Sequence, residues 1–287
     1  MPTIFRYTLA RFRGQIFGWG LALLVLGFPI ISTYDVVIKE QEKIKEVAGN
    51  FAPLIAAMGG DLNKIASPST YLTMRCFTFM PLILGLFAVL GGSGLLVSDE
   101  ENGTLDLVLA HPVSRTGLFT GRLLAFVCTT MVILAVLWIG LFVPMRWTAL
   151  KGQVSAGALL LPMLSLLAVL LLFGTLALLL SMVLPSRRMA AMATGIVLVG
   201  SFFVTSLARV DPRLERIAWL SPLNYYQSGD ALLGLNGAWF GGLLAVAVFF
   251  AVLAWWCFEC RDIRVAGEGG WRWPLLRRRA AASPVLQ

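Results

Sequence analysis

Long apolar stretches alternate with short polar ones along the whole chain. A helix that crosses the roughly 30 Å hydrocarbon core of a bilayer needs about 20 apolar residues. Six stretches reach this length and contain no Asp, Glu, Lys, Arg or His: 14–34, 76–98, 123–145, 152–186, 189–208 and 231–258. The pattern predicts an all-α integral membrane protein with six transmembrane helices.

The composition supports the same class of protein. Hydrophobic residues make up 58% of the 287 residues and charged residues only 13%, whereas a soluble domain carries about 25% charged residues. The polar segments are too short to fold separately, so we expect a single transmembrane domain over residues 1–287. Its polar parts are an outer loop (39–70), a cytoplasmic loop (98–116), a second outer or re-entrant segment (209–230) and a basic tail (259–287).

The distribution of Lys and Arg predicts the orientation in the membrane. With the N-terminus inside the cell, 13 of the 23 basic residues lie on the cytoplasmic side. The short loop at Arg187 and Arg188 and the basic tail count most, because charges in short loops and flanks set topology. Both termini are therefore expected in the cytoplasm. The net charge of +8 suits a tail attracted to anionic lipid, and no folded basic face indicates nucleic-acid binding.

The cytoplasmic loop is the most informative polar segment. It opens with three acidic residues from Asp99 onward, which the bilayer core would not tolerate. Ser98 and Glu101 fit a capping box, and Pro112 ends the helical pattern. The apolar face of this helix would hold Leu105, Val108 and Leu109. The loop therefore predicts a capped amphipathic helix over 99–110, although a solvated acidic turn that favours the helix dipole explains the acids equally well.

The outer loop 39–70 is longer than a turn between two spans requires. Its residues 39–46 mix acidic and basic side chains in the way of an exposed helix. Residues 51–58 are apolar but shorter than a span, so they are expected to rest on the outer interface. Whether the loop gates an exit or contacts an accessory protein stays open.

The segment before the last span predicts a second interruption. Residues 213–220 form a short amphipathic stretch. Ser221 then offers an N-cap, and Pro222 suits the first helical position. The residues that follow, 223–226, form either a re-entrant turn that dips into the membrane or an ordinary surface loop.

Sequence motifs of several enzyme classes are missing. The chain contains no G-x-x-x-x-G-K-[ST] stretch to bind nucleotide phosphates, no H-E-x-x-H and no G-x-S-x-G. The four cysteines and the single histidine lack the spacing of a metal site. Reduced, packed thiols are expected, with a redox pair of Cys257 and Cys260 as the alternative. We therefore expect no catalytic residue, metal or cofactor in this chain.

Several of these residues resemble those of a known family. The cytoplasmic loop reads Glu100-Glu-Asn-Gly-Thr-Leu-Asp-Leu-Val-Leu109, followed by Pro112-Val-Ser-Arg115. It is similar to the first cytoplasmic loop of the membrane subunits of type-2 ABC exporters, in which an acidic residue precedes Gly-Thr-Leu and Pro-Val-Ser-Arg precedes the third span. The segment Ser221-Pro222-Leu-Asn-Tyr225-Tyr226 is similar to the family's Ser-Pro segment before the last span. The resemblance covers essentially the whole chain.

This resemblance implies a permease that pairs with a separate cytoplasmic ATPase, with two copies of each subunit per exporter. The helix of the cytoplasmic loop is then the coupling helix, which sits in a groove of the ATPase. ATP and Mg²⁺ would be bound by the ATPase and not by this chain. The residues implied for coupling are Glu100, Glu101, Gly103, Thr104, Leu105, Val108, Leu109, Pro112 and Arg115. Those implied for the re-entrant segment are Ser221, Pro222, Tyr225 and Tyr226.

The resemblance also implies the assembly, which is a homodimer or a pair with a second permease in the plasma membrane of a bacterium. Apolar walls suit an apolar or amphipathic substrate, such as a drug, an antibiotic or a lipid-like molecule. The alternatives are an ion-coupled carrier, a channel and a non-catalytic membrane subunit. An ion-coupled carrier usually keeps an Asp, Glu or His within a span. The six stretches contain none, and the charged residues between them are interpreted as interfacial.

Overall fold

The computed structural model describes residues 2–101 and 114–260, and all regular structure in them is helical, which confirms the all-α prediction. Before the cytoplasmic loop the helices are α1 (Pro2–Arg11), α2 (Arg13–Ser32), α3 (Tyr34–Lys39), α4 (Gln41–Gly49), α5 (Ala52–Ala57), η1 (Leu62–Lys64), α6 (Pro68–Leu72), η2 (Thr73–Phe77), α7 (Met80–Ser93) and α8 (Val97–Glu101). After it they are α10 (Arg115–Met145), α11 (Ala156–Val183), α12 (Arg187–Ala208), η3 (Pro212–Leu214), α13 (Glu215–Ala218), η4 (Pro222–Tyr225), η5 (Gly229–Leu233) and α14 (Gly237–Cys260).

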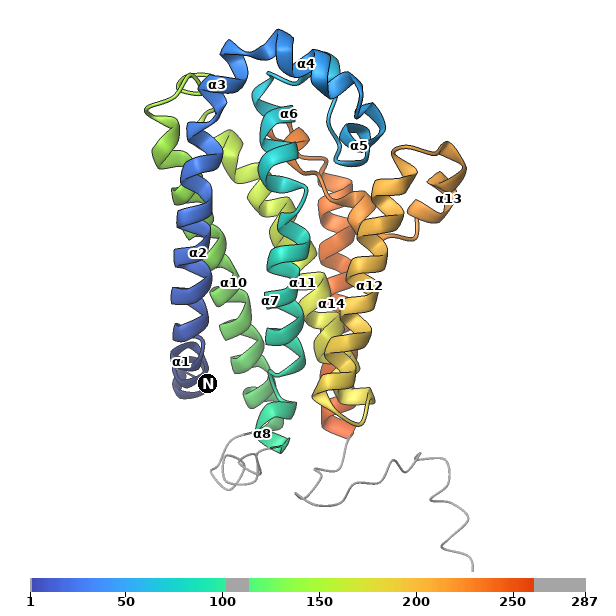
Figure 1. The fold of residues 1–287 in the computed structure, drawn as a ribbon. Helices are drawn as coiled ribbons and strands as arrows, with labels where there is room; N and C mark the ends of the chain where they lie inside the picture. The colour runs from blue at the N-terminus through green and yellow to red at the C-terminus, as the bar shows by residue number, and fades with distance from the viewer. Residues whose placement is uncertain (1, 102–113, 261–287) are drawn as a thin grey trace, which may run out of the picture.

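Within the described residues, five helical segments are long and apolar enough to cross a membrane. They are α2 together with α3, α10, α11, α12 and α14 (Figure 1). A bent pair, in which α6 and η2 (Pro68–Phe77) meet α7 at an angle of 41°, makes a sixth if it is counted as one span. We refer to this pair as the broken span. The chain is a multi-pass membrane protein.

Some spans begin earlier than the apolar stretches because a helix begins at its cap and not at its first apolar residue. The Ser114 hydroxyl accepts a hydrogen bond from the Gly117 backbone N–H at 3.1 Å, so α10 begins about two turns before the stretch. In the same way Ser67 accepts from the Thr70 N–H at 3.3 Å at the start of α6.

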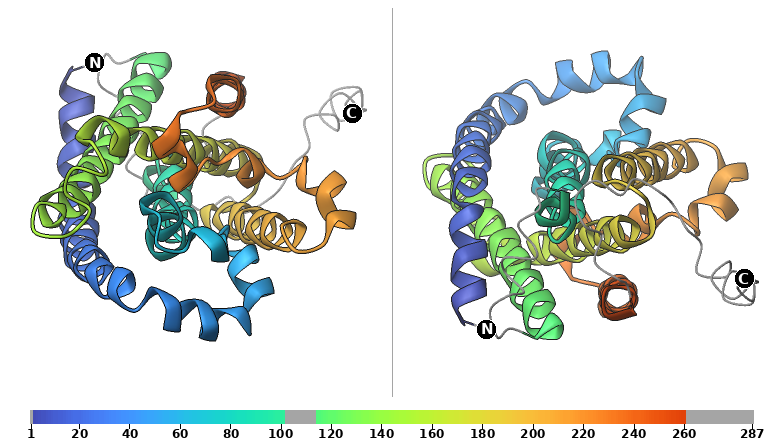
Figure 2. Two further views of the ribbon diagram at one scale, coloured as in Figure 1. Left: turned by 90° about the horizontal axis from the view of Figure 1, so that it is seen from above. Right: turned by 90° about the horizontal axis from the view of Figure 1, so that it is seen from below.

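The helix α11 forms the centre of the bundle and packs against α7, α10, α12 and α14 (Figure 2). In the most apolar part of α11, 72% of the residues are buried, whereas in the most apolar part of α14 only 17% are buried. Two pairs of glycines bring helices into backbone contact. A Cβ on Gly92 of α7 would lie 2.1 Å from the carbonyl oxygen of Gly174 of α11. A Cβ on Gly27 of α2 would lie 2.7 Å from the carbonyl oxygen of Gly140 of α10.

The helices α3, α4 and α5 form an arc over one end of the bundle, which we call the arc end (Figures 1 and 2). The arc begins at α2 and reaches α12 through α5. The Tyr34 hydroxyl donates to the Ala66 carbonyl at 2.9 Å, and the Thr78 hydroxyl donates to the Met58 carbonyl at 2.7 Å. These two hydrogen bonds fix both ends of the arc to the bundle. The exposed helix expected over 39–46 corresponds to α4, and the apolar residues 51–58 contain α5.

At the opposite end, which we call the N-terminal end, α1 lies across the bundle. It is seen end-on in Figure 1 and lengthwise in Figure 2, and it packs against α10. This helix has no counterpart among the predicted elements. The predicted cytoplasmic loop leaves α8 and returns at α10 at this same end (Figure 1). The N-terminal end therefore holds those predicted coupling residues that the structure describes: Glu100, Glu101 and Arg115.

Candidate functional site

The structure places both ends of the predicted coupling segment at the N-terminal end of the bundle. Glu100 and Glu101 belong to α8, and Arg115 is the first residue of α10. Most of the predicted helix 99–110 lies outside the described residues. The same holds for the predicted coupling residues Gly103, Thr104, Leu105, Val108, Leu109 and Pro112. The described residues show how the segment is attached to the bundle.

A buried ionic cluster holds the first end of the segment. The Asp99 carboxylate accepts hydrogen bonds from two guanidinium groups, from Arg122 of α10 and, at 2.6 Å, from Arg11 of α1. Arg122 also donates to the Leu95 carbonyl at 2.8 Å, and Arg11 donates to the Ser98 hydroxyl. Asp99 therefore ties α8 to both α1 and α10.

Two members of this cluster are buried between helices at the N-terminal end of the bundle. Asp99 is 6% exposed and Arg122 is 4% exposed. Burying an ion pair costs least when hydrogen bonds satisfy both partners, as they do here. The predicted capping box is wrong. Because α8 begins at Val97, Ser98 lies inside the helix, and its hydroxyl accepts from Arg11.

Glu101 connects the same segment to α12. Its carboxylate accepts from the backbone N–H of Arg187, the first residue of α12, at 3.0 Å. The first N–H groups of a helix lack partners within the helix and carry partial positive charge, so a carboxylate is stabilised there. The Arg187 guanidinium turns toward α7 and donates to the Leu90 carbonyl at 3.4 Å. Movement of α8 is thereby linked to α12 as well as to α1 and α10.

A polar cavity of about 200 Å³ lies beside the ionic cluster. The charged residues in its wall are Arg11, Asp99, Arg122 and Arg187. Three arginines against one aspartate leave an excess of positive charge, which favours anions in this cavity.

The second end of the coupling segment is attached to α14. The Arg115 guanidinium donates to the Glu259 backbone carbonyl at 3.4 Å, and the Thr116 hydroxyl donates to the Glu259 carboxylate at 2.7 Å. The last carbonyls of a helix lack partners within the helix, so this contact stabilises the end of α14. The sequence indicated Arg115 but neither Thr116 nor Glu259. In the sequence both are simply polar residues next to an apolar stretch. This does not indicate that their side chains contact each other.

The segment that begins with Ser221 lies at the arc end. The helical turn η4 begins at Pro222, in the position predicted for it. The Ser221 hydroxyl does not cap this turn, contrary to the prediction. It donates to the Ser201 carbonyl at 3.0 Å and shares a hydrogen bond of 2.8 Å with the Thr205 hydroxyl, both in α12. The reason is that Ser221 is buried against α12, so its hydroxyl bonds with Ser201 and Thr205 of that helix.

The rest of this segment is anchored to the broken span and to α11. The Tyr226 hydroxyl donates to the Phe77 carbonyl of η2 at 3.1 Å, and the Gln227 N–H donates to the Ser165 hydroxyl of α11 at 2.9 Å. Tyr225 donates to a carbonyl nearer in sequence, that of Trp219, at 3.0 Å. The sequence analysis did not indicate Ser165, because it is one of several hydroxyl residues in the apolar stretch 152–186 and nothing distinguishes it from the others. A re-entrant turn at 223–226 remains a prediction.

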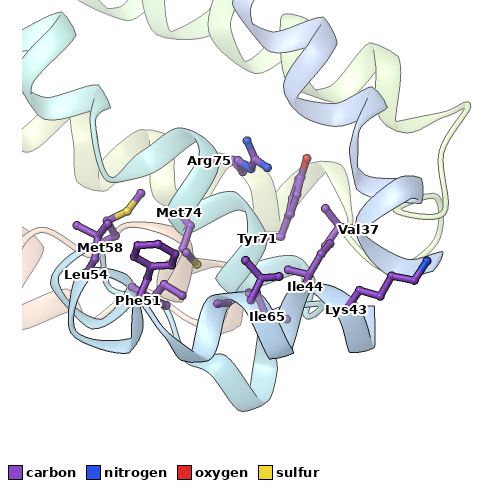
Figure 3. A pocket seen from close by; sticks show the side chains of 13 residues that line it. Val37, Lys43, Ile44, Phe51, Leu54, Met58, Ile65, Tyr71, Met74 and Arg75 are labelled. Carbon is purple, nitrogen blue, oxygen red and sulfur yellow. The ribbon is translucent and has the colours of Figure 1, made fainter. Parts of the chain in front are cut away.

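A second cavity, of about 590 Å³, lies under the arc (Figure 3). The arc supplies one wall, and α6 with η2 of the broken span supplies the other. Apolar side chains such as Ile44, Phe51 and Leu54 dominate the lining, and Tyr71 and Arg75 add polar atoms from the broken span. No sequence pattern predicted this cavity, because the arc and the broken span meet only in the fold. We refer to it as the arc pocket.

The described part of the chain holds no group of three or more His, Cys, Asp or Glu side chains placed to bind a metal ion. Of the cysteines, Cys76 is buried and Cys260 is exposed. His111 lies outside the described residues.

Comparison with known families gives a direct identification. Residues 18–263 match the model of the ABC-2 family transporter protein. The match covers most of the chain and includes the broken span, both attachments of the cytoplasmic loop and the Ser221 segment. A search of curated proteins found no match. The family supplies the transmembrane component of ABC transporters and pairs with an ABC ATPase subunit. The chain belongs to the ABC-2 transporter family, as a membrane permease.

Proposed function

We propose that this permease is the membrane subunit of an ATP-driven exporter. A separate cytoplasmic ATPase binds ATP and Mg²⁺, and the helix predicted at 99–110 docks in a groove of that ATPase. The attachment of this helix carries the proposal. Asp99 joins its first turn to α1 and α10, Glu101 joins that turn to α12, and Arg115, at the start of α10 beyond the helix, contacts α14. An element tethered at so many points transmits a rigid-body shift that a loose loop would absorb.

In this proposal the N-terminal end faces the cytoplasm and the arc end faces outward, in the plasma membrane of a bacterium. The basic side chains at Arg6, Arg13 and Arg188 then lie on the inner side, as the positive-inside rule requires. The exposed apolar side chains of α2 and α12 face lipid or a second permease, with a homodimer as the proposed assembly. The substrate is an apolar or amphipathic molecule.

The orientation predicts opposite labelling of two positions. We expect a single cysteine at Lys43 to react with an impermeant thiol reagent in intact cells, and one at Arg188 to react only after permeabilisation. Both native side chains are exposed, so a difference in labelling reports sidedness and not burial. The background is a variant in which the four native cysteines are replaced. Equal labelling at the two positions in intact cells contradicts the orientation.

The coupling role predicts a large effect at the centre of the predicted helix. Leu105→Asp should reduce the amount of ATPase that co-purifies by at least about tenfold, because removing a buried apolar anchor from an interface costs about 2 kcal/mol or more. Transport-linked ATP hydrolysis in the reconstituted complex should be lost with it. Glu101→Ala should weaken both while the permease still inserts and folds.

Leu220→Asp serves as the matched control for this variant. Leu220 is 86% exposed and lies at the arc end, so the same chemical change there should leave the ATPase bound. Unchanged co-purification and hydrolysis with Leu105→Asp would remove the coupling role. Transport by permease vesicles without ATPase, driven by an ion gradient, would favour the ion-coupled carrier instead.

A further inference from the structure

The arc pocket combines an apolar wall with a cation. Its volume of about 590 Å³ lies within the range of about 300–1,000 Å³ that small-molecule sites occupy. Figure 3 shows Phe51 and Leu54 of the arc next to Met58, Ile44 nearer to Val37, and Arg75 beside Tyr71 on the broken span. Among the residues that line the pocket, Arg75 and Lys43 carry the charge, and both are positive.

Only one of these two charges is neutralised within the protein. Lys43 forms an ion pair with Glu40 at 2.7 Å. Arg75 is exposed to the pocket, and within the described residues no ion pair or hydrogen bond joins its side chain to another residue. A guanidinium that lies beside apolar side chains and has no partner among the described residues is available to pair with the charge of a ligand.

The backbone at Arg75 is also unusual. Arg75 lies in η2, a π-helical turn in which the Thr78 N–H donates to the Thr73 carbonyl five residues earlier, at 2.8 Å. Such turns are rare in helices and occur frequently at functional sites. The π-helical turn lies just before the bend of the broken span and places Arg75 in the wall of the pocket.

An apolar stripe runs along α7 from the residue that precedes it. Its members are 36% to 53% exposed and recur at i, i+4, i+7 and i+11, so they share one face of the helix: Phe79, Ile83, Leu86 and Leu90. The last of them lines the polar cavity at the N-terminal end, next to Arg187. The stripe therefore leads to that cavity.

We propose that the arc pocket binds an amphiphile with an anionic head group and an apolar chain. The head group contacts Arg75, whose planar guanidinium forms two parallel hydrogen bonds with a carboxylate. The chain lies against Ile44, Phe51 and Leu54, where burial removes it from water. That this ligand is the exported substrate rests on the proposed function, whereas the binding itself does not.

Binding of three fluorescent probes to the full chain tests this site. The probes share one dansyl-labelled undecyl chain and end in a carboxylate, a methyl ester or a trimethylammonium group. The protein is held in nanodiscs of phosphatidylcholine, and empty nanodiscs give the contribution of the lipid. We expect the carboxylate to bind at least about tenfold more tightly than the other two, as a hydrogen-bonded ion pair predicts.

Variants at Arg75 separate its charge from its structural role. Arg75→Gln should lower the affinity for the carboxylate about tenfold and leave the ester unchanged, whereas Arg75→Lys should keep the preference. Arg75→Glu should reverse the preference toward the trimethylammonium probe. Arg213→Gln, which removes an exposed arginine outside the pocket, should change none of the three affinities. Phe51→Ser should weaken all three alike.

Equal affinities of the three probes for the unaltered protein would overturn the proposal. So would a carboxylate affinity that Arg75→Gln leaves unchanged in a variant that still elutes as a folded protein. The measurement contains no ATPase, so loss of coupling with Leu105→Asp does not affect it. Conversely, absence of binding in the arc pocket leaves the exporter role intact and removes only this ligand site.

Discussion

Asp99→Ala should lower the free energy of unfolding by about 3–5 kcal/mol, because it leaves the buried Arg122 guanidinium without a counter-charge. Arg122 is 4% exposed, so water cannot replace the missing carboxylate without opening the contact between α8 and α10. Titration with SDS in mixed micelles measures the change in stability. The yield of monodisperse protein in size-exclusion chromatography should fall in parallel.

Three comparison variants test the physical reason for this effect. Arg11→Ala removes a half-exposed partner of Asp99 and should cost no more than about 1 kcal/mol, and Glu42→Ala breaks an exposed pair with Lys45 and should change stability by less than about 0.5 kcal/mol. Combining Asp99→Ala with Arg122→Met removes both buried charges and should recover part of the loss. An Asp99→Ala protein as stable as the Glu42→Ala protein would contradict a buried ionic cluster.

The spans were predictable because the bilayer imposes both a length and a composition on them. Backbone groups in hydrocarbon must be hydrogen-bonded within their own segment, which leaves helices of about 20 apolar residues. Five of the predicted stretches accordingly correspond to single helical segments, and the sixth, 76–98, corresponds to the bent pair. The bend was not predictable, because it lies between Phe77 and Met80, within that apolar stretch, where the hydrophobic pattern shows no break.

The ionic cluster was not predictable from the apolar stretches. These stretches contain no charged residue by definition, so Asp99 and Arg122 lie outside them. Their burial depends on partners that are distant in sequence. Arg11 is 88 residues and Arg122 is 23 residues away from Asp99. A single sequence contains no periodicity that brings such residues together.

The family resemblance indicated where the coupling segment lies in the sequence. The contacts made by the two ends of this segment could be identified only from the folded structure. The partner of Glu101 is the backbone N–H of Arg187, and a backbone group has no signature in the sequence. Arg115 contacts α14 through Glu259, 144 residues away. Local patterns predict caps and apolar faces, whereas these attachments depend on how distant helices pack.

The close contacts between helices were not predictable either, because they also join residues that are distant in sequence. The spacing G-x-x-x-G occurs at Gly14/Gly18, Gly117/Gly121 and Gly237/Gly241, about as often as chance predicts for 28 glycines in 287 residues. A Cβ on the first and last of these pairs would meet no atom within 4 Å. The backbone contacts lie instead at Gly92 with Gly174 and at Gly27 with Gly140, which single glycines on separate helices provide.

Gly92→Ala should destabilise the protein by about 3 kcal/mol, at the upper end of what overpacking usually costs. The added methyl group would lie 2.1 Å from the carbonyl oxygen of Gly174. That oxygen belongs to the backbone of α11 and has no other rotamer to adopt, so α7 and α11 must move apart. Their separation would loosen the central contact of the bundle and open a gap beside Phe126, which is 1% exposed next to Gly174.

Gly241→Ala provides the matched control, because it makes the same chemical change in a helix with no atom within 4 Å of the new methyl group. Alanine favours the helix over glycine by about 1 kcal/mol, so this variant should be neutral or slightly stabilised. The two substitutions therefore differ in sign, although helix propensity alone predicts the same gain for both. Unfolding in mixed micelles distinguishes them, and a Gly92→Ala protein as stable as the Gly241→Ala protein would exclude backbone contact between α7 and α11.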